Sequence, residues 1–79
     1  MADKVDEALT PVINTIAAGN RQRRKGNFEA ARDLYEAAQH ILYALPEEIQ
    51  NNNRWHSEMG YTVGCINTII IFLQKKPTS

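Results

Sequence analysis

Four cationic side chains stand almost next to one another and form the one dense charge cluster of the sequence. They are Arg21, Arg23, Arg24 and Lys25. Such a cluster can bind an anion, a nucleic-acid backbone or an acidic protein surface. At the end of a helix the same cations have a purely structural role, because they interact favourably with the helix dipole. Both interpretations stay open at this stage. Nucleic acid is the less favoured partner, since no other basic element or interleaved aromatic extends the cluster.

Five further side chains are of types that transfer protons or act as nucleophiles. They are His40, His56, Glu58, Tyr61 and Cys65. His56 and Glu58 are two positions apart, a spacing at which side chains on a helix do not face each other. Cys65 lies in an apolar run without a basic neighbour, so its thiol is expected to be a small core or interface group. We therefore predict no catalytic residue and no enzymatic activity.

The composition bounds what the chain can be. Its 79 residues include nine Lys and Arg against nine Asp and Glu, and 43% are hydrophobic. A chain of this length forms one domain and buries only about 60–65% of its unfolded surface, so its stability is marginal. The net charge of zero argues against a generally basic nucleic-acid coat or an acidic disordered tail.

The chain lacks the usual reinforcements of a small domain. Its single cysteine cannot form an internal disulfide, which makes a reducing, cytoplasmic location the default expectation. One cysteine and two histidines also make a structural zinc site implausible, so no metal or cofactor is expected. The most apolar run, residues 69–73, is too short to cross a bilayer, and no membrane association is expected. Stability must come from helix packing or from association.

Apolar residues recur at spacings of three and four, which predicts an all-α protein in the form of a three-helix antiparallel bundle. The helices are expected at residues 3 or 11 to 25, 28–45 and about 50–75. Pro11 allows two starts for the first helix: near Asp3, with the proline inside, or behind an N-cap at Thr10. Asn27 is expected to cap the second helix, and Pro46 to end it.

The third helix is the least certain in its start and in its type. Glu47 and Glu48 suit a first helical turn, whereas Asn51 to Asn53 suit a loop. Its expected buried stripe consists of Trp55, Met59, Val63, Ile66, Ile70 and Leu73. A strand over residues 61–72 competes because many of these residues are β-branched. Helix is preferred, since such a strand would have no partner.

This third helix carries more apolar surface than two short helices can cover, because Cys65, Ile69, Ile71 and Phe72 fall outside the expected stripe. Exposing two or three such side chains forgoes roughly 1.5–3 kcal/mol each. We therefore predict association, most simply as a homodimer, with a hetero-partner helix in a groove as the rival. The expected interface residues are Ile66, Ile69, Ile70, Phe72 and Leu73. The expected groove residues are Tyr35, Leu42, Trp55 and Met59.

The segment from residue 12 to 45 resembles a tetratricopeptide repeat. The matching positions are Gly19, Gly26, Phe28, Ala31, Tyr35 and Ala38. The resemblance implies a tight helical hairpin, and repeats of this family need a neighbour to stack on. Independently of the family, Gly19 and Ala31 remove side chains where two helices would cross, and Gly26 suits a left-handed helix end.

The same hairpin followed by one more helix also resembles the microtubule-interacting-and-transport domain, a three-helix bundle of similar length. That resemblance implies that short partner helices bind in grooves beside the third helix. Both resemblances lead to the same expectation for function. It is a protein–protein interaction module, acting as an adaptor, a chaperone-like protein or a regulatory subunit.

Overall fold

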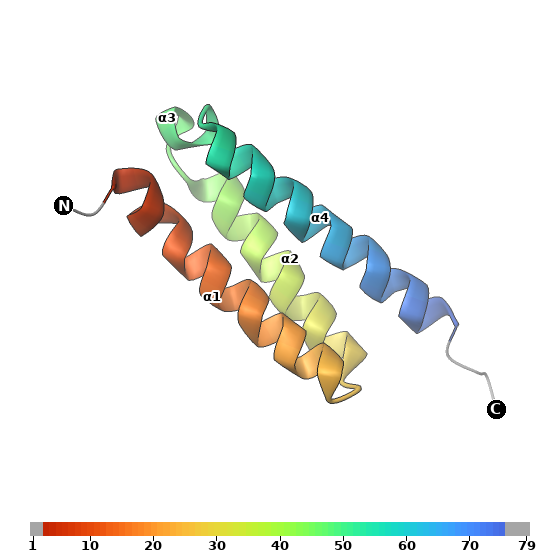
Figure 1. Ribbon diagram of the computed structural model, residues 1–79. Helices are drawn as coiled ribbons and strands as arrows, with labels where there is room; N and C mark the ends of the chain where they lie inside the picture. Colours follow the sequence, from red (N-terminus) through yellow and green to blue (C-terminus); the bar gives the residue numbers. More distant parts are fainter. Residues whose placement is uncertain (1–2, 76–79) are drawn as a thin grey trace.

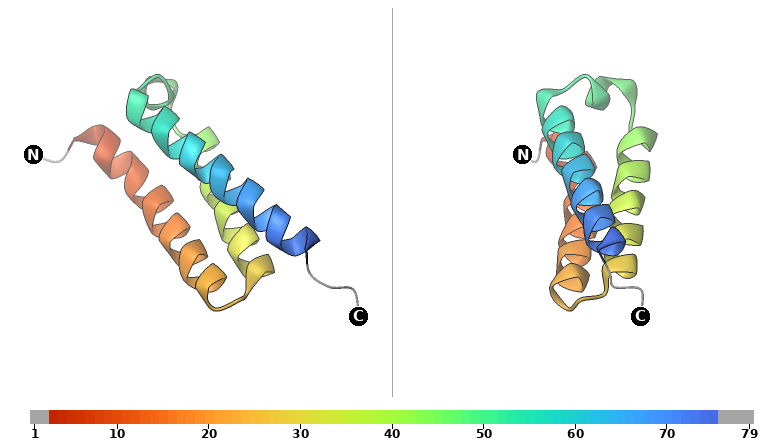
Figure 2. Two further views of the ribbon diagram at one scale, coloured as in Figure 1. Left: turned by 45° about the vertical axis from the view of Figure 1, so that its right-hand side comes forward. Right: turned by 90° about the vertical axis from the view of Figure 1, so that its right-hand side faces the viewer.

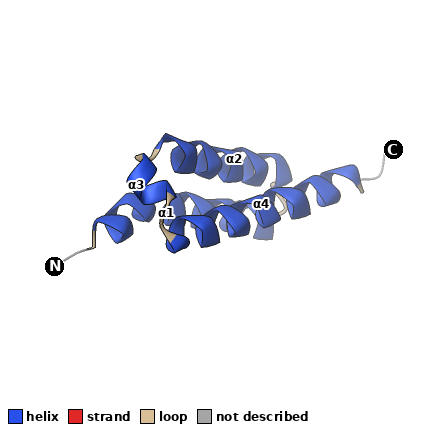
Figure 3. Cartoon of the chain, turned by 90° about the horizontal axis from the view of Figure 1, so that it is seen from above, coloured by secondary structure: helices blue, strands red, loops and turns tan. Residues whose placement is uncertain are grey.

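The computed structural model describes residues 3–75, and this part of the chain is all-α, without a strand (Figure 3). Its helices are α1 (Lys4–Arg24), α2 (Phe28–Ala44), α3 (Glu47–Gln50) and α4 (Asn53–Gln74). Figures 1 and 2 show α1, α2 and α4 side by side, with α2 running opposite to the other two and α3 at one end. The all-α prediction is confirmed, and residues 61–72 are helical rather than a strand. The number of helices is four in this range, not the three expected.

Helix α1 begins at Asp3, which decides between the two starts that Pro11 allowed. The Asp3 side chain caps the helix, its Oδ1 accepting a hydrogen bond from the Val5 backbone N–H at 3.1 Å. Pro11 lies inside the helix. Thr10 is not an N-cap, because its hydroxyl donates to the Asp6 carbonyl one turn earlier at 2.7 Å.

The turn from α1 to α2 has the hydrogen bonds of a Schellman motif. Gly26 adopts a φ of 84°, the left-handed conformation that the sequence predicted for it. The backbone N–H of Gly26 donates to the Arg23 carbonyl at 3.0 Å, and that of Asn27 donates to the Gln22 carbonyl at 2.9 Å. Asn27 occupies the N-cap position of α2, but its side chain does not cap the helix. It donates instead to Gln22 Oε1 at 2.9 Å.

The third expected helix is divided into two by the asparagine run. Pro46 precedes the single turn of α3, and Asn52 then takes an extended conformation. Its Oδ1 accepts a hydrogen bond from the Arg54 N–H at 2.9 Å, which caps α4. The two alternatives for the start of the third helix are therefore both present: an acidic turn follows Pro46, and the asparagine loop follows that turn and caps α4.

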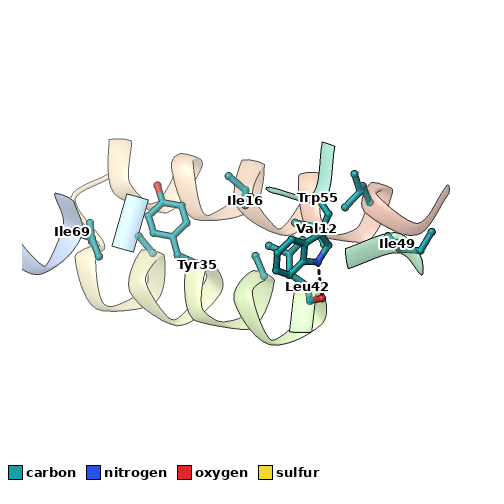
Figure 4. Close-up of a cluster of buried hydrophobic side chains, with 10 residues drawn as sticks. Val12, Ile16, Tyr35, Leu42, Ile49, Trp55 and Ile69 are labelled. Atoms are coloured by element: carbon teal, nitrogen blue, oxygen red, sulfur yellow. Dashed lines mark hydrogen bonds between the residues drawn. The ribbon is translucent and has the colours of Figure 1, made fainter. Parts of the chain in front are cut away.

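The core lies between the three long helices (Figure 4). Its buried apolar side chains are Leu9, Val12, Ile16, Ala31, Tyr35, Ala38, Leu42, Ile49, Trp55 and Ile69. The Trp55 indole N–H donates to the Leu42 carbonyl at 2.9 Å, which ties α4 to α2 (Figure 4). Gly19 is also buried, and a Cβ there would lie 2.7 Å from the Tyr35 ring. The small residue therefore permits the close approach of α1 and α2.

The buried stripe of α4 differs from the one expected. Trp55, Thr62 and Ile69 are its buried residues, whereas Val63 and Ile70 are exposed. The prediction is confirmed for Trp55, and Met59 and Ile66 pack against the core, but it was wrong for Val63 and Ile70 because it left a polar residue out of the stripe. The Thr62 hydroxyl donates to the Glu58 carbonyl at 2.7 Å, so it occupies a core position with its hydrogen bond satisfied.

Candidate functional site

One side of α4 is apolar, uncharged and open to solvent, and we call it the α4 outer face. It consists of Gly60, Val63, Gly64, Asn67, Ile70 and Ile71, which recur at helical spacing and are all exposed. Val63 is 37% exposed, Ile70 36% and Ile71 50%. No charged residue occurs from position 59 to 74. A second helix would therefore meet apolar surface and two glycines that allow its backbone to approach closely.

The predicted interface residues do not all lie on this face. Ile70 is on it, and Ile66 and Leu73 are half-buried. Ile69 is fully buried within the chain, so the expectation that it contributes to an interface was wrong. The exposed Val63, which the sequence pattern assigned to the core, takes its place. The cause is the shift in the buried stripe described above.

Phe72 belongs to a different surface. Its ring stacks on Phe28 of α2, with the centroids 5.4 Å apart and the planes inclined by 12°. The pair lies where the last turns of α4 pass the first turn of α2. A hollow of about 670 Å³ opens beside it, lined by the α1–α2 turn, the first turn of α2 and the last residues of α4. Phe72 thus anchors the last turns of α4 while remaining 43% exposed.

The groove that the sequence suggested is not where it was expected. Leu42 and Trp55 are core residues rather than groove residues, and Met59 is half-buried. Tyr35 is 1% exposed and contributes only the floor of a hollow. These residues were chosen for their apolar character, which serves the core and a groove equally well.

Two further hollows lie between α1 and α4. The first has a volume of about 430 Å³ and is lined by Ile13, Ile16, Ala17, Asn20, Ser57, Glu58 and Tyr61. The second has a volume of about 360 Å³ and is lined by Arg23, Tyr35, Tyr61, Gly64, Cys65 and Thr68. We call the second one the Arg23 hollow. Tyr61 lines both, so the two adjoin.

A polar network connects the three long helices at these grooves. The Tyr35 hydroxyl of α2 donates a hydrogen bond to Asn20 Oδ1 of α1. The Asn20 amide nitrogen in turn lies 3.5 Å from the Tyr61 hydroxyl of α4. The sequence did not predict this network, because Asn20 and Tyr61 are 41 positions apart and neither belongs to a recognisable motif.

Burial raises the pKa of two acids in the Arg23 hollow, Tyr35 and Cys65. Desolvation raises the pKa of the Tyr35 hydroxyl, and the nearby Cys65 raises it further. Burial also raises the pKa of the Cys65 thiol, against the smaller opposing effects of a hydrogen bond from Tyr61 and the charge of Arg23. Cys65 is therefore a thiol rather than a thiolate at neutral pH, as the sequence predicted for an unactivated cysteine.

We expect the chain to lose stability in alkaline solution. The unfolded chain releases the Cys65 proton at the ordinary pKa of about 9.0 and the Tyr35 proton at about 10.0, whereas the folded chain holds both to higher pH. The contribution of these two groups to the free energy of unfolding should thus be constant below about pH 8 and decrease as the pH rises from there to 11. Urea unfolding at pH 7, 9 and 10.5 measures it. Cys65→Ala should make the decrease between pH 8 and 10 shallower, and an unchanged or rising stability would contradict the assignment.

The remaining candidates for chemistry are not assembled into a catalytic group. His40 and His56 are exposed on different helices, and His56 packs edge-on against Trp55 at a centroid distance of 5.1 Å. Tyr61 and Cys65 are the two candidates that the structure brings to one hollow. Within residues 3–75, no three side chains of the His, Cys, Asp and Glu types are placed to hold a metal ion.

The basic cluster is divided by the fold. Arg21, Arg24 and Lys25 are exposed at the end of α1, where they suit the helix dipole. Arg23 alone is half-buried and lines the hollow above Tyr35. Its surroundings differ from those of its neighbours because its position on α1 faces α4.

Comparisons of the chain with protein-family models, with the curated proteins and with the solved structures find no match. None of the helices between residues 3 and 75 combines the length and apolar character needed to cross a bilayer.

Proposed function

We propose that the chain is a small, non-enzymatic protein–protein interaction module that associates with a second copy of itself through the α4 outer face. The observation that carries this proposal is the exposure of Val63, Ile70 and Ile71 along a helix segment without charge. Each is a branched apolar side chain whose burial is favourable by roughly 25 cal/mol per Å². A two-fold dimer places each of them in the interface twice.

Two further features support this surface over the others. A Cβ built on Gly60 or Gly64 meets no atom within 4 Å, so the middle of the face is open for a second backbone. Because the net charge of the chain is zero, two copies do not repel each other through their overall charge. The groove between α1 and α4 is a separate surface on the same module, where we propose that a partner segment binds.

The role we propose is that of an adaptor, a chaperone-like protein or a regulatory subunit in the cytoplasm. The close contact of Gly19 with Tyr35 supports a tetratricopeptide-like hairpin within a three-helix antiparallel bundle. A single unpaired thiol, half-buried at Cys65, is consistent with a reducing compartment.

Sedimentation equilibrium of the wild type and two charge variants tests the proposed dimer. Ile71→Glu places a carboxylate within the interface and is expected to weaken association at least 100-fold, since burying an unpaired charge costs several kcal/mol. Ile71 is half exposed, so the variant should keep its helical circular dichroism and melt near the wild type. Ala37→Glu adds the same charge at an exposed position of α2 and should leave the dimer intact. A wild type and Ile71→Glu of equal mass would contradict the assignment.

A further inference from the structure

We propose that the Arg23 hollow is a binding site for an oxyanion, namely a carboxylate or phosphate group. The inference does not depend on the dimer, because its donors Arg23, Tyr61 and Thr68 are not part of the α4 outer face, although Gly64 borders both surfaces. It differs from the earlier expectation of an anion-binding cluster, since it involves Arg23 and residues of α2 and α4 rather than the three exposed cations beside it.

The first observation is an unsatisfied cation. The Nε–H of Arg23 is buried and has no hydrogen-bond acceptor among the described residues. A guanidinium stays protonated at all physiological pH values, and a buried N–H without an acceptor is unfavourable. The ion pair present within residues 3–75, Arg54 with Asp6, lies at the other end of the bundle. Arg23 therefore offers an unpaired donor and an unneutralised charge.

The second observation concerns the hydroxyl groups around the same hollow. The Tyr61 hydroxyl receives the Asn20 amide, and its own proton faces the Cys65 sulfur, a weak acceptor that a ligand oxygen can replace. Thr68 differs from the other three threonines in the described helices. Thr10, Thr15 and Thr62 each donate to the carbonyl four residues earlier, whereas Thr68 has no such bond. Its hydroxyl is thus uncommitted.

The third observation is the charge balance within the hollow. Its residues include no carboxylate, and Cys65 and Tyr35 are neutral because burial raises the pKa of each. Tyr35 commits its proton to Asn20, which leaves Arg23, Tyr61 and Thr68 as the donors that a ligand in the hollow can use. Glu58 lines the adjoining hollow, and its carboxylate forms no ion pair with Arg23. Three donors and one positive charge around about 360 Å³ suit a ligand with several acceptor oxygens.

Nuclear magnetic resonance of the Arg23 Nε–H signal tests the site in the full chain. Sodium acetate, sodium phosphate and an N-acetylated, amidated glutamate are titrated separately, with sodium chloride holding the ionic strength constant. We expect a saturable shift with a dissociation constant on the order of millimolar, because one charge and two hydroxyls carry the binding. Saturation by acetate or phosphate indicates a site for free oxyanions. Saturation by the glutamate alone indicates one for an acidic side chain, and both results support the proposal.

Matched variants separate the site from general electrostatics. Arg23→Gln and Arg24→Gln remove the same charge from adjacent positions, and their binding is followed on the backbone amides of Tyr61 and Thr68. Binding should be lost in the first and unchanged in the second, and Thr68→Val should weaken it several-fold. Circular dichroism shows whether each variant is folded. Shifts that never saturate, or equal effects of Arg23→Gln and Arg24→Gln, would overturn the proposal. If Arg23→Gln is unfolded, anion binding by Thr68→Val is compared with binding by Thr10→Val. Equal binding by these two variants would then overturn the proposal.

Discussion

Replacing Trp55 with alanine is expected to remove most of the stability of the chain at 25 °C. Trp55 lies in the first turn of α4 and is 7% exposed. Its indole N–H donates a hydrogen bond to the Leu42 carbonyl near the end of α2 at 2.9 Å. Removing a buried tryptophan side chain costs about 3–5 kcal/mol. A domain of this length has a total free energy of unfolding of only about 5 kcal/mol. Urea unfolding followed by circular dichroism measures the loss.

Two companion variants separate the packing of Trp55 from its hydrogen bond. Trp55→Phe keeps most of the ring but leaves the Leu42 carbonyl without the indole donor, so it should lose about 1–3 kcal/mol. Tyr43→Ala removes a neighbouring aromatic that is 59% exposed and should cost less than about 1 kcal/mol. A Trp55→Ala chain that unfolds at nearly the same urea concentration as the wild type would show that this end of the core is not as described.

Replacing Gly19 with valine is expected to destabilise the hairpin of α1 and α2. A Cβ at this position would lie 2.7 Å from Tyr35 Cε1 and 2.8 Å from Cδ1. The ring cannot move aside easily, because Tyr35 is 1% exposed and its hydroxyl is bonded to Asn20. Overpacking of this kind costs about 1–3 kcal/mol, and the two further methyl groups of valine add to it. Urea unfolding again gives the magnitude.

The sign of the change in stability on replacing glycine with alanine distinguishes a steric role of Gly19 from the general preference of helices for alanine over glycine. Gly60 is also inside a helix, but a Cβ there meets nothing within 4 Å. In an Ile71→Glu background, which removes the proposed contact between copies, Gly60→Ala should therefore stabilise the chain by up to about 1 kcal/mol, whereas Gly19→Ala should destabilise it despite the same gain in helix propensity. Tyr35→Leu should reduce the cost of Gly19→Ala by making room. Changes of the same sign at Gly19 and Gly60 would contradict the close packing.

The features that the sequence predicted correctly depend on local signals. The second helix was expected at residues 28–45 and spans Phe28–Ala44, since Gly26 and Pro46 end and delimit helices by their own backbone restrictions. The left-handed Gly26 and the small Gly19 followed from the same kind of argument. Pro11 left two starts open because the deciding contact is a single hydrogen bond at an exposed helix end, the one between the Val5 N–H and the Asp3 side chain.

The features that the sequence did not predict depend on contacts between helices. The periodicity of α4 fits two adjacent stripes, and only packing against α2 decides that Ile69 is buried and Val63 exposed. The sequence did not predict that Thr62 is a core residue, because the hydrogen bond to the Glu58 carbonyl that makes its burial favourable is visible only in the folded helix. The Arg23 hollow required three helices to be placed together, since the residues around it come from α1, α2 and α4.

The pairing of two copies through the α4 outer face is tested most directly by a distance between spin labels. A nitroxide is attached at Asn67→Cys, in the centre of the face, or at Ala37→Cys on the exposed side of α2, each in a Cys65→Ala chain. Packed helices have axes roughly 8–10 Å apart. Pulsed electron paramagnetic resonance should therefore show a short distance between the two labels at position 67 of the paired copies, and a longer one between the labels at position 37. No dipolar signal between copies at concentrations up to millimolar, or a shorter distance for Ala37, would contradict the proposed interface.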